Sequence, residues 1–456
     1  MLRLATVSLL AALAGCSSSS SSHVGLADAG AGGSDGSGPT MDGARDGARD
    51  GARDAARDAA RDAARDAAKG STDGAIDAPR EASRSDARAA SVDAATDTGA
   101  PSTVDAPPSG ATTVRFHYPA GSHTLSVRGA LSPLNWMTGA PLTPGPDDTW
   151  SITFPTLPGA LQCKPLLDDL TWSLGPNYDV PVGSTVDIHP RFTTTQGSWS
   201  VAFQWTSAIL ATTRGIYVYL PPSYSENTDA KFPVVYMHDG QNLFDPAASF
   251  GGVAWQIQSA MDNGAGDGSI AEALVVGIDN DSNRIAEYTP VTDPTTDEGG
   301  AALGDEYLNA LITELKPQID AMYRTLPDRT HTFMMGSSLG GLITAYAGVE
   351  HADVYGAVGI LSPSTWWDNQ WIIGIVGTIP MKPTRSIRVY LDSGNAGTSS
   401  DDVTQTAMLD QQYVTEGYVQ GKTLDYLVQD GGQHSESYWA ERAPGALGFV
   451  VGARSP

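Results

Sequence analysis

The second half of the chain alternates apolar runs with helix-period segments. Near-continuous apolar runs predict strands over residues 215–220, 232–238, 273–278, 331–335, 356–361, 387–391 and 424–428. Apolar positions at helical spacing predict helices over 307–323, 339–349, 403–414 and 437–451, with Pro444 interrupting the last. Strands that are apolar on both faces and alternate with helices are typical of a mostly parallel sheet covered on both sides. Residues 201–456 are therefore predicted to form one α/β domain.

A different pattern covers residues 111–200. Short segments alternate apolar and polar residues between turns rich in Pro, Gly and Asp, and they predict strands over 113–118, 124–128, 150–154 and 184–188. Such spacing indicates a small all-β sandwich. The order of Gly129, Asn135-Trp136, Trp150 and Lys164 resembles immunoglobulin-like modules of the starch- and glycogen-binding type. On that resemblance Trp136 and Trp172 would stack on sugar rings, and packing in the core or between domains is the alternative.

The first 110 residues show neither pattern. Residues 1–15 carry one positive charge and then an apolar stretch too short to span a bilayer, which indicates a signal peptide. The segment ending at Cys16 resembles a bacterial lipobox, and this implies lipidation of Cys16 and, with Ser17 following, an outer-membrane address in a Gram-negative bacterium. A plain secretory peptide is the alternative. Residues 16–110 are low-complexity, with four-residue Asp/Ala/Arg repeats that cannot bury a core, and predict a disordered tether.

Charge and cysteine content restrict the remaining function classes. The net charge of −25 argues against nucleic acid as a partner. The chain has two cysteines. If Cys16 is acylated, Cys163 has no partner for an intramolecular disulfide, and we expect it to be a small buried residue.

Residues 336–340 carry the strongest chemical signal. They read Gly-Ser-Ser-Leu-Gly, the G-x-S-x-G pattern, directly between a predicted strand and a predicted helix. A serine on such a turn has its hydroxyl exposed at the edge of the sheet, so Ser338 is the candidate nucleophile. The amide of Leu339, at the helix N-terminus, is a candidate oxyanion donor. The alternative is a glycine-rich turn with an idle serine.

A serine nucleophile needs a base and an acid, which in α/β-hydrolases follow it in the chain. His434 lies between the last predicted strand and the last helix, where the base is expected. The acid should lie in the loop after residues 387–391, where Asp401 is favoured, then Asp402, then Asp392. The sequence does not decide among them.

Two more segments are candidates for substrate contacts. The loop after residues 232–238 contains Gly240 and Gln241, either of whose amides could supply a second oxyanion donor. Trp366 and Trp367 lie near Trp371 in a predicted loop, which favours an aromatic platform for substrate, with core packing as the alternative.

Five motifs in order resemble the putative esterase family, which includes enterochelin, esterase D-like and feruloyl or acetyl-xylan esterases. They begin at Met237, Val276, Gly336, Ser362 and Gly432. The resemblance implies an α/β-hydrolase fold and a serine carboxylic-ester hydrolase without metal or cofactor. Its substrate would be a small-molecule or glycan ester of the siderophore, feruloyl or acetyl-glycan type. A surface-displayed glycan-binding lipoprotein on a hydrolase scaffold, or an acyltransferase, are the alternatives.

Overall fold

The computed structural model describes residues 110–295, 301–378, 387–396 and 401–454. The expected signal peptide, Cys16 and the tether lie outside these residues and stay predictions. Within the described ranges, none of the helices combines the length and the apolar character needed to cross a bilayer.

Residues 112–188 form two sheets that share one core. In the first sheet the strand order is β4 (Thr143–Pro144), β5 (Thr149–Phe154), β1 (Thr112–His117) and β9 (Thr185–Ile188). In the second it is β3 (Ala140–Pro141), β2 (Leu125–Gly129), β6 (Leu161–Leu167) and β7 (Thr171–Trp172), with β8 (Tyr178–Val180) also paired to β6. Val114 and Phe116 of one sheet and Val127, Leu161 and Cys163 of the other belong to the same buried cluster. The four predicted strands are present, and β6, which carries Cys163, was not predicted.

The large sheet has eight strands and is mostly parallel. The strand order is β10 (Ser198–Thr206), β11 (Thr213–Leu220), β13 (Leu274–Ile278), β12 (Val234–His238), β14 (Thr332–Ser338), β15 (Ala357–Pro363), β16 (Arg388–Gly394) and β17 (Leu424–Gln429). From β13 to β17 all neighbours are parallel, whereas β11 is antiparallel to both β10 and β13. The carboxyl ends of the parallel strands therefore meet at one edge of the sheet.

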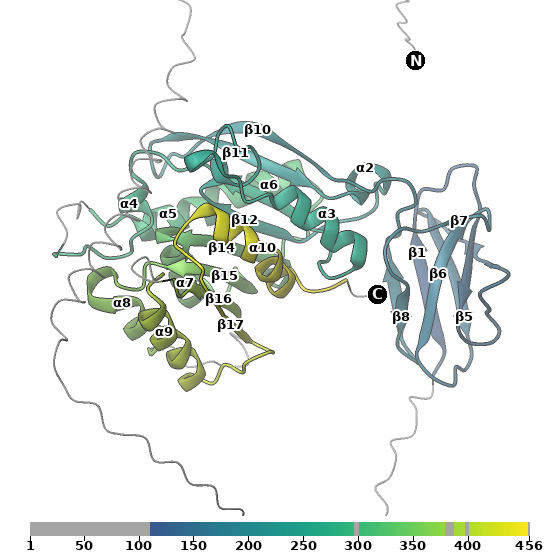
Figure 1. The fold of residues 1–456 in the computed structure, drawn as a ribbon. Helices are drawn as coiled ribbons and strands as arrows, with labels where there is room; N and C mark the ends of the chain where they lie inside the picture. The colour runs from purple at the N-terminus through teal and green to yellow at the C-terminus, as the bar shows by residue number, and fades with distance from the viewer. Residues whose placement is uncertain (1–109, 296–300, 379–386, 397–400, 455–456) are drawn as a thin grey trace, which may run out of the picture. The chain divides into compact units, whose positions relative to one another are not determined.

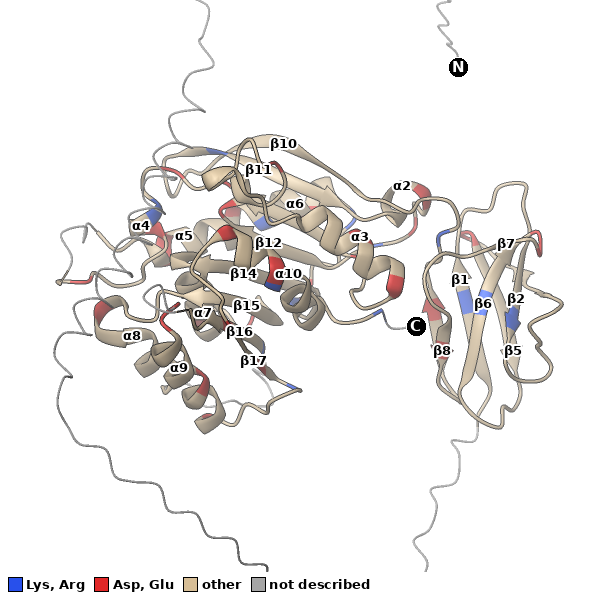
Figure 2. Ribbon diagram, viewed as in Figure 1, with Lys and Arg blue, Asp and Glu red and all other residues tan. Residues whose placement is uncertain are grey.

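Helices cover both faces of this sheet (Figure 1). One face packs against α3 (Ile257–Asp267) and α10 (Glu436–Val451). The other packs against α5 (Gly304–Ala310), the π-helical turn η3 (Leu311–Leu315), α6 (Lys316–Met322), α7 (Leu339–Glu350), α8 (Trp367–Val376) and α9 (Val403–Thr415). Helices α3, α8 and α9 each carry acidic residues, coloured red in Figure 2. The expected α/β-hydrolase architecture is confirmed.

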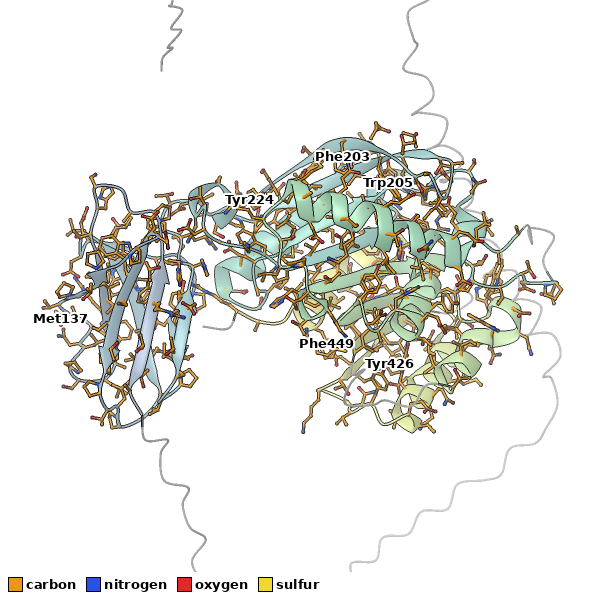
Figure 3. The ribbon with its side chains drawn as sticks, turned by 180° about the vertical axis from the view of Figure 1, so that it is seen from behind. Met137, Phe203, Trp205, Tyr224, Tyr426 and Phe449 are labelled. Carbon is orange, nitrogen blue, oxygen red and sulfur yellow. The ribbon has the colours of Figure 1, made fainter. Side chains whose placement is uncertain are left out.

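All the strands and helices predicted for this domain are present, with ends shifted by a few residues. Among the described residues of this domain, the strands and α-helices that were not predicted are β10, α3, α8 and the short helices α2 (Ser223–Glu226) and α4 (Arg284–Glu287). Strand β10 lies at the edge of the sheet and is mostly exposed, although Trp199, Val201, Phe203 and Trp205 recur at every second position. Phe203 and Trp205, labelled in Figure 3, lie on β10, and Trp205 is buried in the core. Because β10 begins at Ser198, it spans the predicted domain boundary at residue 200.

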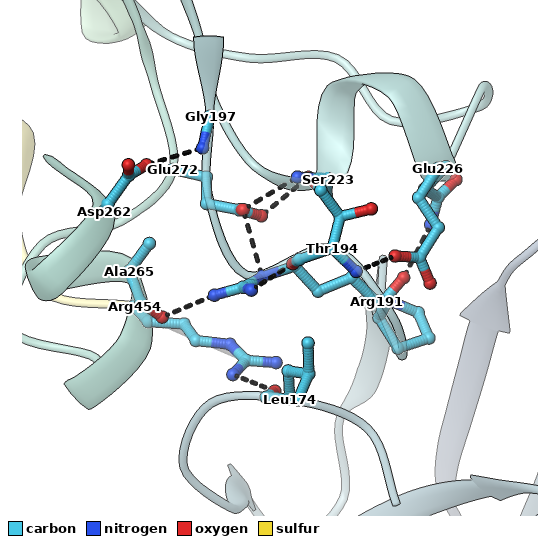
Figure 4. Close-up of polar contacts among 12 residues, drawn as sticks. Leu174, Arg191, Thr194, Gly197, Ser223, Glu226, Asp262, Ala265, Glu272 and Arg454 are labelled. Atoms are coloured by element: carbon cyan, nitrogen blue, oxygen red, sulfur yellow. Dashed lines mark hydrogen bonds and ion pairs between the residues drawn. The ribbon is translucent and has the colours of Figure 1, made fainter. Parts of the chain in front are cut away.

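Charged groups fix the segment between β9 and β10 (Figure 4). The Glu226 carboxylate accepts hydrogen bonds from the successive backbone amides of Phe192, Thr193 and Thr194, at 2.5 to 3.2 Å. The Arg191 guanidinium lies 3.2 Å from the Glu272 carboxylate. These contacts give the backbone amides of this partly exposed segment defined hydrogen-bond partners.

Candidate active site

Ser338 lies on a strained turn between β14 and α7. Its backbone has φ 58° and ψ −127°, a conformation that residues with a Cβ rarely adopt and that is concentrated at functional sites. A Cβ at Gly336 would lie 2.6 Å from the carbonyl oxygen of Gly340 and 2.7 Å from Cδ2 of His238. Glycine is therefore required at position 336, and the predicted strand–turn–helix geometry is confirmed.

His434 faces this serine from the loop between β17 and α10. Its Nε2 lies 2.9 Å from Oγ of Ser338, within hydrogen-bond range. The imidazole packs edge-on against the indole ring of Trp439, with ring centroids 4.9 Å apart. The two residues that the sequence selected are thus brought together, although 96 positions separate them.

Asp401 is the carboxylate that contacts the histidine. Its Oδ1 pairs with Nδ1 of His434, so the imidazole is bonded at both nitrogens. Asp402, the second candidate, instead occupies the N-cap position of α9, where its carbonyl accepts from the amide of Thr406. Asp392, the third, pairs through Oδ2 with the guanidinium of Arg442 at 3.0 Å. Nδ1 carries at most one proton, and that N–H faces the Asp401 carboxylate. The geometry therefore favours Asp401 as the acid and corrects the prediction that included Asp402.

Hydrogen-bond donors surround the other oxygen of Asp401. Its Oδ2 accepts from the amide of Gly394 at 2.9 Å, from Nη2 of Arg442 at 3.2 Å and from the hydroxyl of Ser362. Burial alone would raise the pKa of the Asp401 carboxyl, but the charge of His434 and the bonds from His434 and Ser362 outweigh it and lower the pKa. Burial raises the pKa of the neighbouring Asp392 to about 6, despite the opposing charge of Arg442.

The loop after β12 packs directly against the serine turn. The backbone of Asp239 is in the left-handed region, with φ 55°, and the short 3-10 helix η1 (Gly240–Asn242) follows it. A Cβ at Gly340 would lie 3.5 Å from Oδ2 of Asp239. A Cβ at Gly240 would lie 2.6 Å from backbone atoms of Gly277 and Ile278, so only glycine fits there. The predicted oxyanion segment therefore lies beside the serine turn.

An ion-pair network that the sequence did not predict holds this loop. Arg284 bonds to both carboxylate oxygens of Asp239, at 2.9 and 3.0 Å, and Asn280 donates to Oδ1 at 2.6 Å. Glu287 lies three positions after Arg284, but its carboxylate bonds to Arg214 at 2.7 Å. Arg284 and Glu287 therefore belong to two separate buried ion pairs.

His238 ends β12 inside the same buried region. Its Nδ1 lies 2.9 Å from the hydroxyl of Tyr307, and burial lowers the pKa of His238 to about 4. His238 is therefore neutral at pH 7 and part of the support under the serine turn. This leaves His434 as the histidine that contacts Ser338 among the described residues.

Trp366 and Trp367 do not form an exposed platform. Their exposed fractions are 8% and 2%, and both belong to the buried cluster under α7 and α8. The indole N–H of Trp367 donates to the carbonyl of Val291 at 2.7 Å. The platform interpretation is therefore wrong and core packing is correct. It failed because residues 366–371 were expected to form a loop, whereas Trp367 begins α8.

This fold and the serine–histidine contact at the carboxyl edge of its sheet define the α/β-hydrolase class. Residues 207–450 match the model of the family described as putative esterase. The chain therefore belongs to the putative esterase family and is a carboxylic ester hydrolase.

Several proteins with similar sequences are known. An uncharacterized protein of Bacillus subtilis, YbbA, is 28% identical over 250 residues, which are 52% of this chain and 93% of that protein. An endo-1,4-beta-xylanase/feruloyl esterase of Xylanibacter ruminicola is 30% identical over 33% of this chain and 19% of its own length. An iron(III) salmochelin esterase of Escherichia coli is 26% identical over 59% of this chain and 62% of its own length.

Solved structures also match this chain. A ferulic acid esterase has 21% identity and a TM-score of 0.44, covering 56% of this chain and 98% of that one. The enterobactin esterase FES of Shigella flexneri has 15% identity and a TM-score of 0.43, covering 74% and 92%.

Proposed function

We propose that this protein hydrolyses carboxylic esters through a Ser338–His434–Asp401 triad and an acyl-enzyme. Nε2 of His434 takes the proton as Oγ of Ser338 bonds to the ester carbonyl carbon, and the same proton is then given to the departing alcohol. A water molecule, deprotonated by His434, attacks the acyl-enzyme and releases the acid and the serine. The Asp401 carboxylate holds the tautomer with the proton at Nδ1 and stabilises the imidazolium. The observation that carries the proposal is the 2.9 Å contact between Nε2 and Oγ.

The oxyanion would be held by two backbone amides. Leu339 is the first residue of α7, so its N–H has no acceptor within the helix and lies at the positive end of the helix dipole. In the second loop the choice was between Gly240 and Gln241. The amide of Gln241 is a hydrogen-bond donor to the Asp279 carboxyl, which favours Gly240 as the second donor.

Gly240→Ala tests that assignment. Its Cβ has no room against β13, so the loop must shift and carry the amide away from the oxyanion. We expect kcat to fall about 10²- to 10³-fold, the usual cost of losing one oxyanion donor, with a smaller change in KM. Steady-state hydrolysis of a short p-nitrophenyl ester measures this. The matched control is Gly266→Ala, whose Cβ would meet open space and which should keep its rate. Full kcat in Gly240→Ala would remove Gly240 from the proposal.

The names of two relatives suggest which class of ester the protein hydrolyses. These relatives are named for feruloyl and salmochelin esters, so we propose an ester of the siderophore, feruloyl or acetyl-glycan type. Hydrolysis rates for a feruloyl sugar ester, a catecholate trilactone and an acetylated xylan, each measured with the wild-type protein and Ser338→Ala, test this. Serine-dependent hydrolysis of simple alkyl esters alone would contradict the class but not the mechanism.

A second candidate function rests on the small β domain. Trp136 and Trp172 are 36% and 37% exposed, with ring centroids 6.2 Å apart, and Arg128 lies 5.2 Å from the Trp172 ring. Such a pair of exposed rings favours glycan binding. Affinity electrophoresis of wild type and Trp136→Ala in soluble glucans tests it: retardation of the wild type alone is expected. Equal mobility in buffer and glucan would contradict it.

A further inference from the structure

Ser362 lies buried behind the site at the carboxyl end of β15. It has no exposed surface, and its backbone has φ 40°. Its amide donates to Oδ1 of Asp392 at 3.0 Å, which joins β15 to the adjacent strand β16. The reaction proposed above gives this residue no role, and a buried strained serine in an otherwise apolar strand needs an explanation.

The hydroxyl of Ser362 has three neighbours that together fix the direction of its proton. The indole Nε1 of Trp439 lies 2.9 Å from Oγ, and Nη2 of Arg442 lies 2.5 Å from it. Indole and guanidinium nitrogens only donate hydrogen bonds, so both lone pairs of Oγ are occupied. The third neighbour is Oδ2 of Asp401, which only accepts when it is ionised. The hydroxyl proton of Ser362 must therefore point at Asp401.

We propose that Ser362 is a positioning residue for Asp401: its hydroxyl, oriented by Trp439 and Arg442, keeps the carboxylate ionised and turned toward His434. This inference rests on the proposed function, since it assigns the means by which the triad acid is held. Ser362 does not touch substrate. It acts through Asp401, and Asp401 acts through the imidazole.

The distribution of donors over the two oxygens of Asp401 explains the effect. Oδ2 takes the bonds from Gly394, Arg442 and Ser362, which leaves Oδ1 facing Nδ1 of His434. Each donor stabilises the ionised form and lowers the basicity of the carboxylate. The charged groups that face Asp401 are His434 from the loop after β17, Arg442 from α10 and Asp392 from β16. Of these donors, the hydroxyl can be removed without changing any formal charge.

Ser362→Ala should lower kcat about 10- to 100-fold with little change in KM, because a bond to an ionised group is lost and substrate is not contacted. The pH profile should also shift. Without this donor the Asp401 carboxylate is more basic, so it binds a proton, or stabilises protonated His434, at higher pH than in the wild type. The acid limb of kcat/KM should therefore move to higher pH, and part of the lost activity should return as the pH rises.

The experiment compares Ser362→Ala and Ser362→Gly in the full chain, with kcat and KM measured between about pH 5 and 9. Glycine relieves the strain at φ 40°, so a shift shared by both variants comes from the missing hydroxyl and not from the backbone. The matched control is Ser393→Ala, which removes another fully buried hydroxyl, from β16. It should keep the wild-type acid limb. Melting temperatures identify variants that lose activity by unfolding.

The proposal is supported if the acid limb of kcat/KM moves to higher pH in both Ser362 variants and stays in place in Ser393→Ala. The proposal is overturned if folded Ser362→Ala has the wild-type kcat and the wild-type acid limb of kcat/KM. It is also overturned if Ser362→Ala loses kcat by the same factor at every pH. Ser338→Ala separates these results from a failure of the proposed function. If Ser338→Ala keeps its turnover, the triad itself is wrong, whereas normal Ser362 variants beside an inactive Ser338→Ala overturn the positioning role alone.

Discussion

Ser338→Ala is expected to abolish ester hydrolysis, with kcat lowered about 10⁵- to 10⁶-fold, as losses of a nucleophile in serine hydrolases usually are. The residue supplies the atom that bonds to the acyl carbon, and the water reaction that remains has only the oxyanion donors to accelerate it. The fold should be unaffected. The Ser338 hydroxyl contacts His434 and Ser364, and alanine has the same backbone restriction at φ 58° as serine.

Ser337→Ala provides the control, since it removes the other serine of the same turn, which is also buried. The measurement is turnover of a p-nitrophenyl ester, with thermal unfolding as the test of folding. Ser337→Ala should keep a rate within about threefold of wild type, because the hydroxyl that contacts Nε2 of His434 belongs to Ser338. A loss confined to Ser337→Ala would transfer the nucleophile to position 337 and contradict the account.

Asp401→Asn should reduce kcat about 10⁴-fold, whereas Asp402→Asn should change it less than about threefold. The amide can present its NH₂ group to Nδ1 of His434 and so stabilise the wrong tautomer, and it cannot stabilise an imidazolium. Asp402 differs by one position and carries the same charge, but it is at the N-cap of α9. The pair of variants therefore separates catalytic contact from local charge.

A double variant tests whether Asp392 could act in place of Asp401. The Asp392 carboxylate is fully buried and pairs with Arg442 at 3.0 Å, whereas the Asp401 carboxylate pairs with His434. We expect kcat of the double variant, Asp401→Asn with Asp392→Asn, to lie within about threefold of kcat of Asp401→Asn alone. The reason is that a group without a part in the step contributes little to its rate. A further large loss in the double variant would show that Asp392 substitutes for Asp401.

The sequence predicted the architecture of the large domain because its central strands are buried on both faces. Strands β12 to β15 are buried at every position, and each contains a run of apolar residues. Edge strand β10 does carry an apolar residue at every second position from Trp199 to Trp205, but the domain boundary predicted at residue 200 divides it, so it was not recognised as a strand. Helix α8 was missed because three tryptophans suggested a surface loop, although large aromatic residues bury more apolar area than any others.

Ser338 and His434 could be found from sequence because each lies on a short local pattern at the end of a predicted strand. Asp401 could not be singled out, since its role depends on contacts with His434 and Ser362, which are distant in the chain. The contacts of Ser362 with Trp439 and Arg442 link positions about 80 residues apart, which a single sequence does not reveal. The pairing of Arg284 with Asp239 was hidden for the same reason.

The most direct test of the account is reaction of the protein with a fluorophosphonate, followed by peptide mass mapping. A hydroxyl activated by a neighbouring imidazole reacts at the rate of a nucleophile, whereas ordinary serines do not. We predict one phosphonyl group per chain, on the peptide that contains Ser338, and much slower labelling when His434 is replaced by alanine. Labelling at any other residue, or unchanged labelling without His434, would contradict the proposed triad.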